Sequence, residues 1–210
     1  MQKVLFDKDA AFSLYCSAIS ETRYRTEVVR SLIGDSPPNV EARYLQELSY
    51  LQLRKVCELI AFGCLVAHGD IRGTQTSKPK KKWNADKIVL ALRKLHRNFY
   101  PQPFTIGRIV GKTAIEEKME EPFLTKAELL SLYRVECPRY LHSGTVDDLV
   151  ARRRPPIDRN KIAGYLGKIS NLLTRHRIHL YGISQALRVD ASLPDFAVNA
   201  QSFESYALRR

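Results

Sequence analysis

The sequence lacks the segments that direct a chain into or across a membrane. Its start, MQKVLFDKDAAFSLYC, has neither the unbroken apolar run nor the small-residue cleavage site of a secretory signal. The longest strongly apolar run, Leu59–Ala67, is about half as long as a bilayer span. We therefore expect a soluble, cytoplasmic protein without a membrane partner, and its 210 residues with 44% apolar content are sufficient to build a core.

Metal-binding motifs and paired cysteines are missing as well. The four cysteines include no CxxC pair, and the five histidines include no HExxH and no cluster with cysteine. Isolated cysteines in apolar helical patterns indicate buried thiols in a reducing compartment. We expect no metal site and no cofactor.

A phosphate-binding loop is only partly present. The stretch IGRIVGKT at 106–113 has the spacing GxxxGKT, one residue shorter than the GxxxxGK[ST] of a P-loop. The following EEKMEE adds negative charge where a phosphate would bind. The sequence predicts a surface hairpin here, with FTIGRIV at 104–110 as a short strand.

The positive charge, in contrast, is large and unevenly placed. The net charge is +12, and residues 72–112 contain eleven Lys/Arg against Asp86 alone, while residues 152–188 contain nine against Asp158 alone. Clustered cations gain free energy by releasing counterions from a phosphate backbone. These two basic blocks indicate an anionic partner, and RNA or DNA fits best.

Apolar spacing predicts a mainly α fold, a helical bundle with a long antiparallel helical hairpin and a small C-terminal β-hairpin. The hairpin comprises a helix from about Asp9 to Leu32 and a second from an N-cap at Asn39 to His68. A basic loop over 71–84 precedes a third helix that starts at Asn84. We expect parts 1–97 and 98–210 to fold together as one unit.

The second half contains clear helix starts. Thr125 and Glu128 form a capping box, a short helix is expected after Thr145, and Asp158 caps a helix that continues through His176. The tail ALRVDASLPDFAVNA alternates apolar and polar residues around a Ser-Leu-Pro-Asp turn, which is typical of a β-hairpin.

The second helix has a line of polar side chains on an otherwise apolar segment. At 100° per residue its members lie within about 40° of one line, and they are Arg43, Glu47, Tyr50, Arg54, Glu58 and His68. One interpretation is an ion-pair network that fixes the register of the bundle. The other is that Arg54 and Glu58 border a cleft.

A catalytic partner for this line would come from another element. The stretch CPRYLHSGT at 137–145 reads as a constrained turn that presents Arg139 and His142 together. Histidine exchanges a proton near neutral pH, and arginine holds a phosphodiester. A second Arg/His pair, RHRIH at 175–179, is expected at a helix C-terminus, where cations are favoured in any case.

The segment YLQLRKVCELIAFGCLVAHGD, followed later by RYLHSG, resembles the HEPN superfamily of small helical bundles, in outline over residues 8–176. The resemblance implies an all-α core, frequent dimers, and ribonuclease or RNA-binding roles in toxin–antitoxin and phage-defence systems. The RxxxxH-type spacing of the active members is not matched by His142 with Arg134 or Arg139, nor by Arg175 with His179.

Together these features predict a protein that works on or beside RNA or DNA. The expected phosphate contacts are made by Lys78, Lys80, Lys81, Lys82, Arg152, Arg153 and Arg154. If the chain is an enzyme, we expect metal-independent phosphodiester cleavage, with His142 as general acid/base, Arg139 or Arg54 stabilising the phosphorane, and Glu58 orienting the arginine. The alternative is a noncatalytic assembly module whose polar line meets a second copy or another protein.

Overall fold

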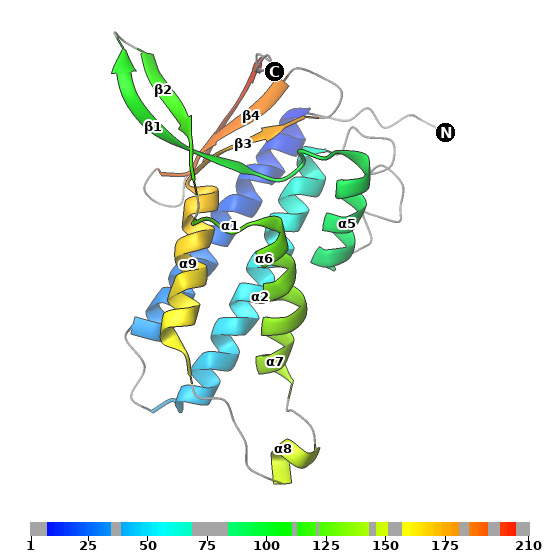
Figure 1. The fold of residues 1–210 in the computed structure, drawn as a ribbon, viewed down its shortest axis with the longest axis vertical. Helices are drawn as coiled ribbons and strands as arrows, with labels where there is room; N and C mark the ends of the chain where they lie inside the picture. Colours follow the sequence, from blue (N-terminus) through cyan, green and yellow to red (C-terminus); the bar gives the residue numbers. More distant parts are fainter. Residues whose placement is uncertain are drawn as a thin grey trace.

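Two long antiparallel helices organise the molecule, as the sequence predicts (Figure 1). They are α1 (Lys8–Gly34) and α2 (Ala42–Ala67). The computed structural model describes residues 8–34, 39–68, 84–110, 113–120, 122–142, 146–150, 157–180, 185–192 and 198–204. The expected N-cap of α2 is wrong by two residues, because Glu41 and not Asn39 occupies that position, and its side chain makes no capping hydrogen bond.

The two helices approach closely at Gly63 of α2. A Cβ atom placed on this residue would lie 3.2 Å from Cε2 of Tyr15 on α1. The absent side chain therefore makes room for the Tyr15 ring, which is fully buried. This contact positions the end of α2 that meets the rest of the molecule.

A broken helix packs against the other side of α2. It consists of α6 (Lys126–Ser131), a π-helical turn η1 (Leu132–Glu136) and α7 (Cys137–Leu141). The wide turn has a physical cause, because Pro138 has no N–H and its ring would clash with the carbonyl of Arg134 in a regular α-helix. The Cys137 N–H instead bonds to the Leu132 carbonyl, five residues back.

The remaining helices are α5 (Ala85–Leu95), α8 (Val146–Val150) and α9 (Arg159–Leu173). The predicted caps of the later helices are confirmed. Thr125 and Glu128 form both bonds of a capping box, and the Asp158 carboxylate accepts from the Lys161 N–H. The third helix starts after Asn84 as expected, although the Asn84 side chain makes no capping bond.

A five-stranded antiparallel sheet lies across one end of the bundle (Figure 1). Its order is β2-β1-β3-β4-β5, and the strands are β1 (Gln102–Val110), β2 (Thr113–Lys118), β3 (Arg175–His179), β4 (Gln185–Asp190) and β5 (Asn199–Glu204). The predicted hairpins β1–β2 and β4–β5 are both present.

Two expectations about this region are wrong. The C-terminal hairpin is not an isolated unit, because β3 pairs with both β1 and β4 and joins the two hairpins. The residues RHRIH do not end a helix, since α9 stops at Leu173 and 175–179 form β3. The cause is a buried alternation in β3, where His176 and Ile178 face the core.

One continuous group of buried apolar side chains joins the bundle and the sheet, from Tyr15 on α1 to Val189 on β4. Three of the four cysteines are buried in it as expected, Cys57, Cys64 and Cys137, whereas Cys16 is only partly buried. Burial raises the pKa of the Cys137 thiol to about 12. Within the described parts of the chain, no helix is both long and apolar enough to cross a bilayer.

Candidate nucleic-acid interface

Arg54 and Glu58 lie together on α2, and a third group holds them. The Arg54 Nε lies 3.5 Å from Glu58 Oε1, while the Tyr133 hydroxyl of η1 accepts from Arg54 Nη2 (3.1 Å) and donates to Glu58 Oε1 (3.3 Å). The Arg54 guanidinium also stacks on the Tyr133 ring, and Lys55 Nζ lies 3.2 Å from Glu58 Oε2. Glu58 is 5% exposed. This part of the polar line is therefore an internal network that ties α2 to η1.

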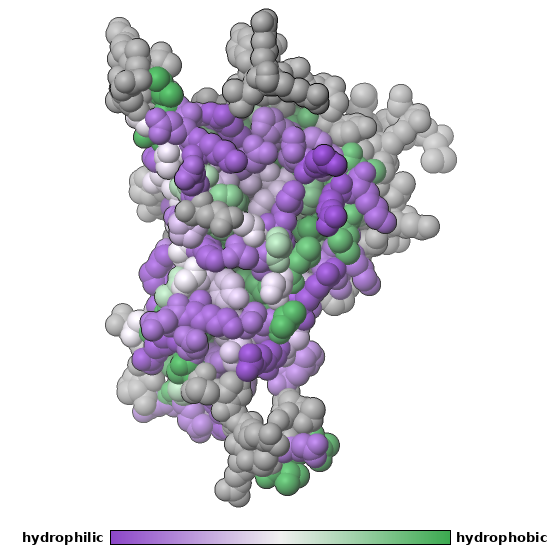
Figure 2. Space-filling view, viewed as in Figure 1, coloured by the Kyte–Doolittle hydropathy of each residue, from purple (hydrophilic) through white to green (hydrophobic). Residues whose placement is uncertain are grey.

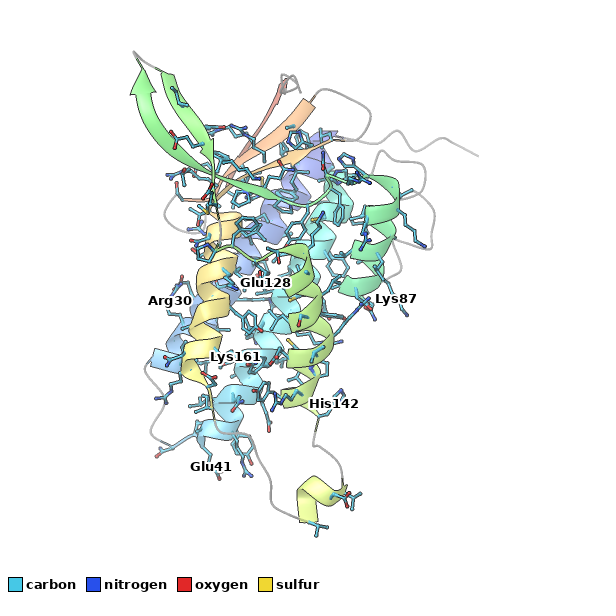
Figure 3. All side chains as sticks on the ribbon, in the orientation of Figure 1. Arg30, Glu41, Lys87, Glu128, His142 and Lys161 are labelled. Atoms are coloured by element: carbon cyan, nitrogen blue, oxygen red, sulfur yellow. The ribbon has the colours of Figure 1, made fainter. Side chains whose placement is uncertain are left out.

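Arg139 and His142 lie at the end of α7. The predicted turn at 137–145 is wrong in its first half, because residues 137–141 are helical and His142 follows as the C-terminal cap. Both side chains are exposed, and Figure 3 shows His142 at the tip of the helix. The Arg139 guanidinium lies 5.7 Å from the Tyr140 ring, which stacks on Tyr50 of α2.

The structure does not join these residues into one constellation. Among the described residues, no hydrogen bond, ion pair or ring contact links the His142 imidazole to Arg54, Glu58 or Arg139. The other expected phosphate contacts lie outside the described residues, and they are Lys78, Lys80, Lys81, Lys82, Arg152, Arg153 and Arg154.

The second basic block is largely neutralised by the fold. Each of five of its described cations forms an ion pair with a carboxylate, and the pairs are Lys161–Glu136, Lys168–Glu128, Arg175–Asp190, Arg177–Glu116 and Arg188–Glu116. These carboxylates come from other elements of the chain in every case. The block therefore contributes less free positive charge than its composition suggests.

Glu116 is the clearest example of this neutralisation. Arg177 and Arg188 face each other across β3 and β4, and both guanidinium groups lie over the Phe104 ring, 5.1 and 5.2 Å from its centroid. Like charges in directly opposite positions destabilise a sheet. Glu116 of β2 accepts from both arginines and so compensates for their repulsion.

The part of the first basic block that lies on and just after α5 is different, because no described carboxylate pairs with its cations. Lys87, Arg93 and Lys94 are exposed on this helix, and Arg97 is exposed just beyond its end. Across the part of the chain that the structure describes, none of these four cations pairs with a carboxylate. The single acidic residue of α5, Asp86, forms its ion pair with Arg134. Figure 3 shows Lys87 pointing away from the bundle.

The exposed cations lie on the solvent side of the helix, with Arg93 about 100° around the axis from Lys94. Lys87 and Lys94 are seven residues apart and therefore lie two turns from each other on one line. The opposite side of α5 is buried through Ile88, Val89 and Leu92. In Figure 2, hydrophilic side chains cover much of the helical body, with hydrophobic side chains among them near α5. The basic face of α5, defined as Lys87, Arg93, Lys94 and Arg97, is thus open to an anionic partner.

Sequence reasoning counted these four cations but assigned the phosphate contacts to the lysines before them. The spacing of Ile88, Leu92 and Leu95 already placed the buried side of this helix, and the cations follow on the other side. The apolar spacing in the sequence was therefore sufficient to place these cations on the exposed side of the helix. Only the fold shows that, among the described residues, the basic face of α5 has no carboxylate partner, whereas five cations of the second block are paired.

The buried histidines have structural roles. The His176 Nε2 accepts from the Tyr15 hydroxyl at 2.5 Å, and its Nδ1–H donates to the Leu173 carbonyl at 3.1 Å. Burial lowers the pKa of His176 to about 4, so the ring is neutral. This bond pair connects α1 to the start of β3.

Two further histidines converge on the carbonyl of His179 at the end of β3. The His68 Nε2 lies 3.1 Å and the His96 Nε2 lies 2.8 Å from this oxygen, and the His68 Nδ1 lies 2.8 Å from the Cys64 carbonyl. These contacts join α2, the end of α5 and β3. Among the described residues, no three His, Cys, Asp or Glu side chains are arranged to hold a metal ion.

No protein-family model matches this sequence, and no curated protein and no solved structure shows significant similarity to it. The assignment of a function therefore depends on the residues themselves.

Proposed function

We propose that the protein binds nucleic acid through the phosphate backbone and that the basic face of α5 is its main contact. The observation that carries this proposal is the group of exposed cations on and just after α5 that have no carboxylate partner in the described chain. An unpaired guanidinium or ammonium group retains its counterions, which are released when a phosphate replaces them. The lysines at 78–82 directly precede this helix in the sequence and extend the positive charge.

Such contacts position a nucleic acid without reading its bases. We therefore expect binding to single-stranded and duplex RNA or DNA with little sequence preference, and a strong dependence on salt. Each phosphate contact contributes about 0.7 to the slope of log K against log salt for a single strand and about 0.9 for a duplex.

The test compares two triple variants with the same loss of charge. The first removes cations of the basic face of α5, Lys87→Ala/Arg93→Ala/Lys94→Ala. The control removes exposed or partly exposed cations elsewhere, Arg30→Ala/Arg43→Ala/Lys118→Ala. Fluorescence anisotropy with labelled oligonucleotides gives the affinity over a range of salt concentrations.

We expect the α5 variant to bind more weakly, with a salt slope reduced by about 2, and the control to bind almost as the unchanged protein does. An equal loss in both variants would show that net charge alone attracts the ligand. The absence of binding by the unchanged protein at low salt would contradict the proposal directly.

A second candidate function is metal-independent RNA cleavage in the manner of HEPN ribonucleases. The supporting observation is that Arg139 and His142 are both exposed and lie three residues apart at the end of α7. Here His142 would act as general acid/base and Arg139 would hold the phosphate. Incubation of structured RNA with the protein in EDTA tests this version, and cleavage that persists in His142→Ala argues against it.

A further inference from the structure

The first half of α2 has a line of apolar side chains on its outward side that is open to solvent. Tyr44, Leu48 and Leu51 are 49%, 39% and 40% exposed, and their spacing of four and three residues places them along one line of the helix. The opposite side of α2 is buried, with Leu53 and Ile60 almost inaccessible. A helix that is apolar on both sides is typical of a buried position.

The neighbours of α2 flank this line and leave it open. On one side α1 contacts α2 through the bond from Arg25 to Gln52 at 2.7 Å. On the other side α7 contacts it through the stacked rings of Tyr50 and Tyr140. The exposed line of Tyr44, Leu48 and Leu51 faces away from both contacts.

The charged residues beside this line have opposite signs, so the surface is complementary to a second copy of itself. Glu47 and Lys55 lie four residues before and four residues after Leu51, so the three residues form one row along the helix. Glu47 is exposed and forms no ion pair with any described residue. Lys55 is half exposed, and its ammonium group has donors to spare beyond its contact with Glu58.

We propose that two copies of the chain associate through α2, antiparallel and about a twofold axis near Leu51. In the commonest class of helix packing, rows of residues spaced by four run side by side on the two helices. Reversal of the partner row then brings Glu47 of each copy to Lys55 of the other. The line of Tyr44, Leu48 and Leu51 is buried between them. A second copy fits this surface because the row supplies both members of each ion pair.

The contact is of moderate strength. A standard interface covers about 800 Å² on each partner, which exceeds what three partly exposed side chains provide. We therefore expect a dimer that dissociates on dilution in the micromolar range.

Sedimentation velocity over a range of concentrations tests the association. The unchanged protein should shift from monomer to dimer, and Leu51→Asp should raise the dissociation constant by more than about tenfold, because two carboxylates would face each other at the axis. The control is Ile115→Asp on β2, which removes a side chain of equal exposure at a site remote from α2. Circular dichroism confirms that each variant is folded.

Charge reversal provides a second, independent measurement. Glu47→Lys alone should weaken the dimer, and Glu47→Lys combined with Lys55→Glu should restore it, since each copy again meets its complement. A thiol introduced as Leu51→Cys should form an intermolecular disulfide on oxidation, whereas Ile115→Cys should not. A monomer at all concentrations, or equal dissociation by Ile115→Asp, would overturn the proposal.

Discussion

At the scale of single residues, the Tyr15–His176 pair shows how buried polar side chains link distant parts of the chain. His176 accepts from Tyr15 and donates to the Leu173 carbonyl, which fixes its neutral tautomer. Protonation of the ring would remove the acceptor that the Tyr15 hydroxyl uses. The stability of the fold is thereby coupled to pH.

The sign of this coupling follows from the pKa of His176. Burial lowers it from 6.5 to about 4, so between these values the unfolded chain binds a proton that the folded chain does not. The contribution of neutral His176 to the free energy of unfolding is present above pH 6.5 and is lost as the pH falls toward 4. We expect a loss of about 2 kcal/mol in the free energy of unfolding between pH 7 and pH 5 from this group.

Urea unfolding at the two pH values measures this loss. The matched variant is His176→Gln, whose amide can replace both hydrogen bonds but does not titrate. The unchanged protein should lose about 2 kcal/mol more than this variant does. Equal losses in both proteins would show that other groups cause the pH dependence.

The contacts of Glu58 lead to a second prediction at the scale of single residues. Glu58→Gln removes the charge that Arg54, Lys55 and Tyr133 share, in a position that is 5% exposed. We expect the free energy of unfolding to fall by about 2 kcal/mol, because the Arg54 guanidinium loses its buried partner.

The control for this network is Lys55→Ala. Its side chain is 50% exposed, and a pair screened by water contributes less than about 1 kcal/mol. Thermal or urea unfolding of the two variants gives the comparison. A loss for Lys55→Ala as large as that for Glu58→Gln would contradict the view that Arg54 and Tyr133 hold this carboxylate.

At the scale of elements, the packing of α1 on α2 depends on the absence of a side chain at Gly63. Gly63→Ala would place a methyl group 3.2 Å from the Tyr15 ring, which its bond to His176 and full burial keep in place. We expect this variant to lose about 1 to 3 kcal/mol of stability despite the better helix propensity of alanine.

The matched control lies on α9. Nothing is within 4 Å of a Cβ atom placed on Gly164, which is also inside a helix. Gly164→Ala should therefore stabilise the protein by about 0.5 to 1 kcal/mol. Differential scanning calorimetry of both variants gives opposite shifts in melting temperature, and shifts of the same sign would contradict the close contact at Gly63.

The elements differ in how far the sequence predicts them. Helices arise from contacts three and four residues apart, so the spacing of apolar residues and the caps at Thr125 and Asp158 located them well. The sheet depends on pairing between β1 and β3, whose residues are far apart in the sequence. Nothing local indicates this pairing, because β3 alternates over five residues only and follows α9 directly.

The candidate sites also differ in this way, because their local contacts were predictable from the sequence and their long-range contacts were not. Arg54 and Glu58 are four residues apart on one helix, and their contact was predicted from spacing alone. The hydroxyl of Tyr133 that completes this network comes from an element 79 residues further along. The ion pairs that neutralise the second basic block are also long-range, and so the sequence could not rank the two blocks.

At the scale of the whole molecule, the fold separates its positive charge into a neutralised part and an open part. Arginines on the sheet are held by Glu116 and Asp190, whereas the basic face of α5 has no internal counter-charge among the described residues. Uncompensated like charges destabilise the compact state by mutual repulsion. A bound polyanion removes this repulsion only in the folded protein, where the cations are gathered on one side.

A polyanion should therefore stabilise the native state. A ligand at a hundred times its dissociation constant adds about 2.7 kcal/mol, which corresponds to a rise in melting temperature of roughly 5 to 10 °C for a chain of this length. Thermal unfolding with and without a short RNA measures the rise, which should disappear at high salt and in Lys87→Ala/Arg93→Ala/Lys94→Ala. The melting temperature of that variant without RNA should rise slightly, because the three exposed side chains pair with no described carboxylate and their mutual repulsion is removed. A rise that persists in the variant would place the polyanion on another surface of the protein.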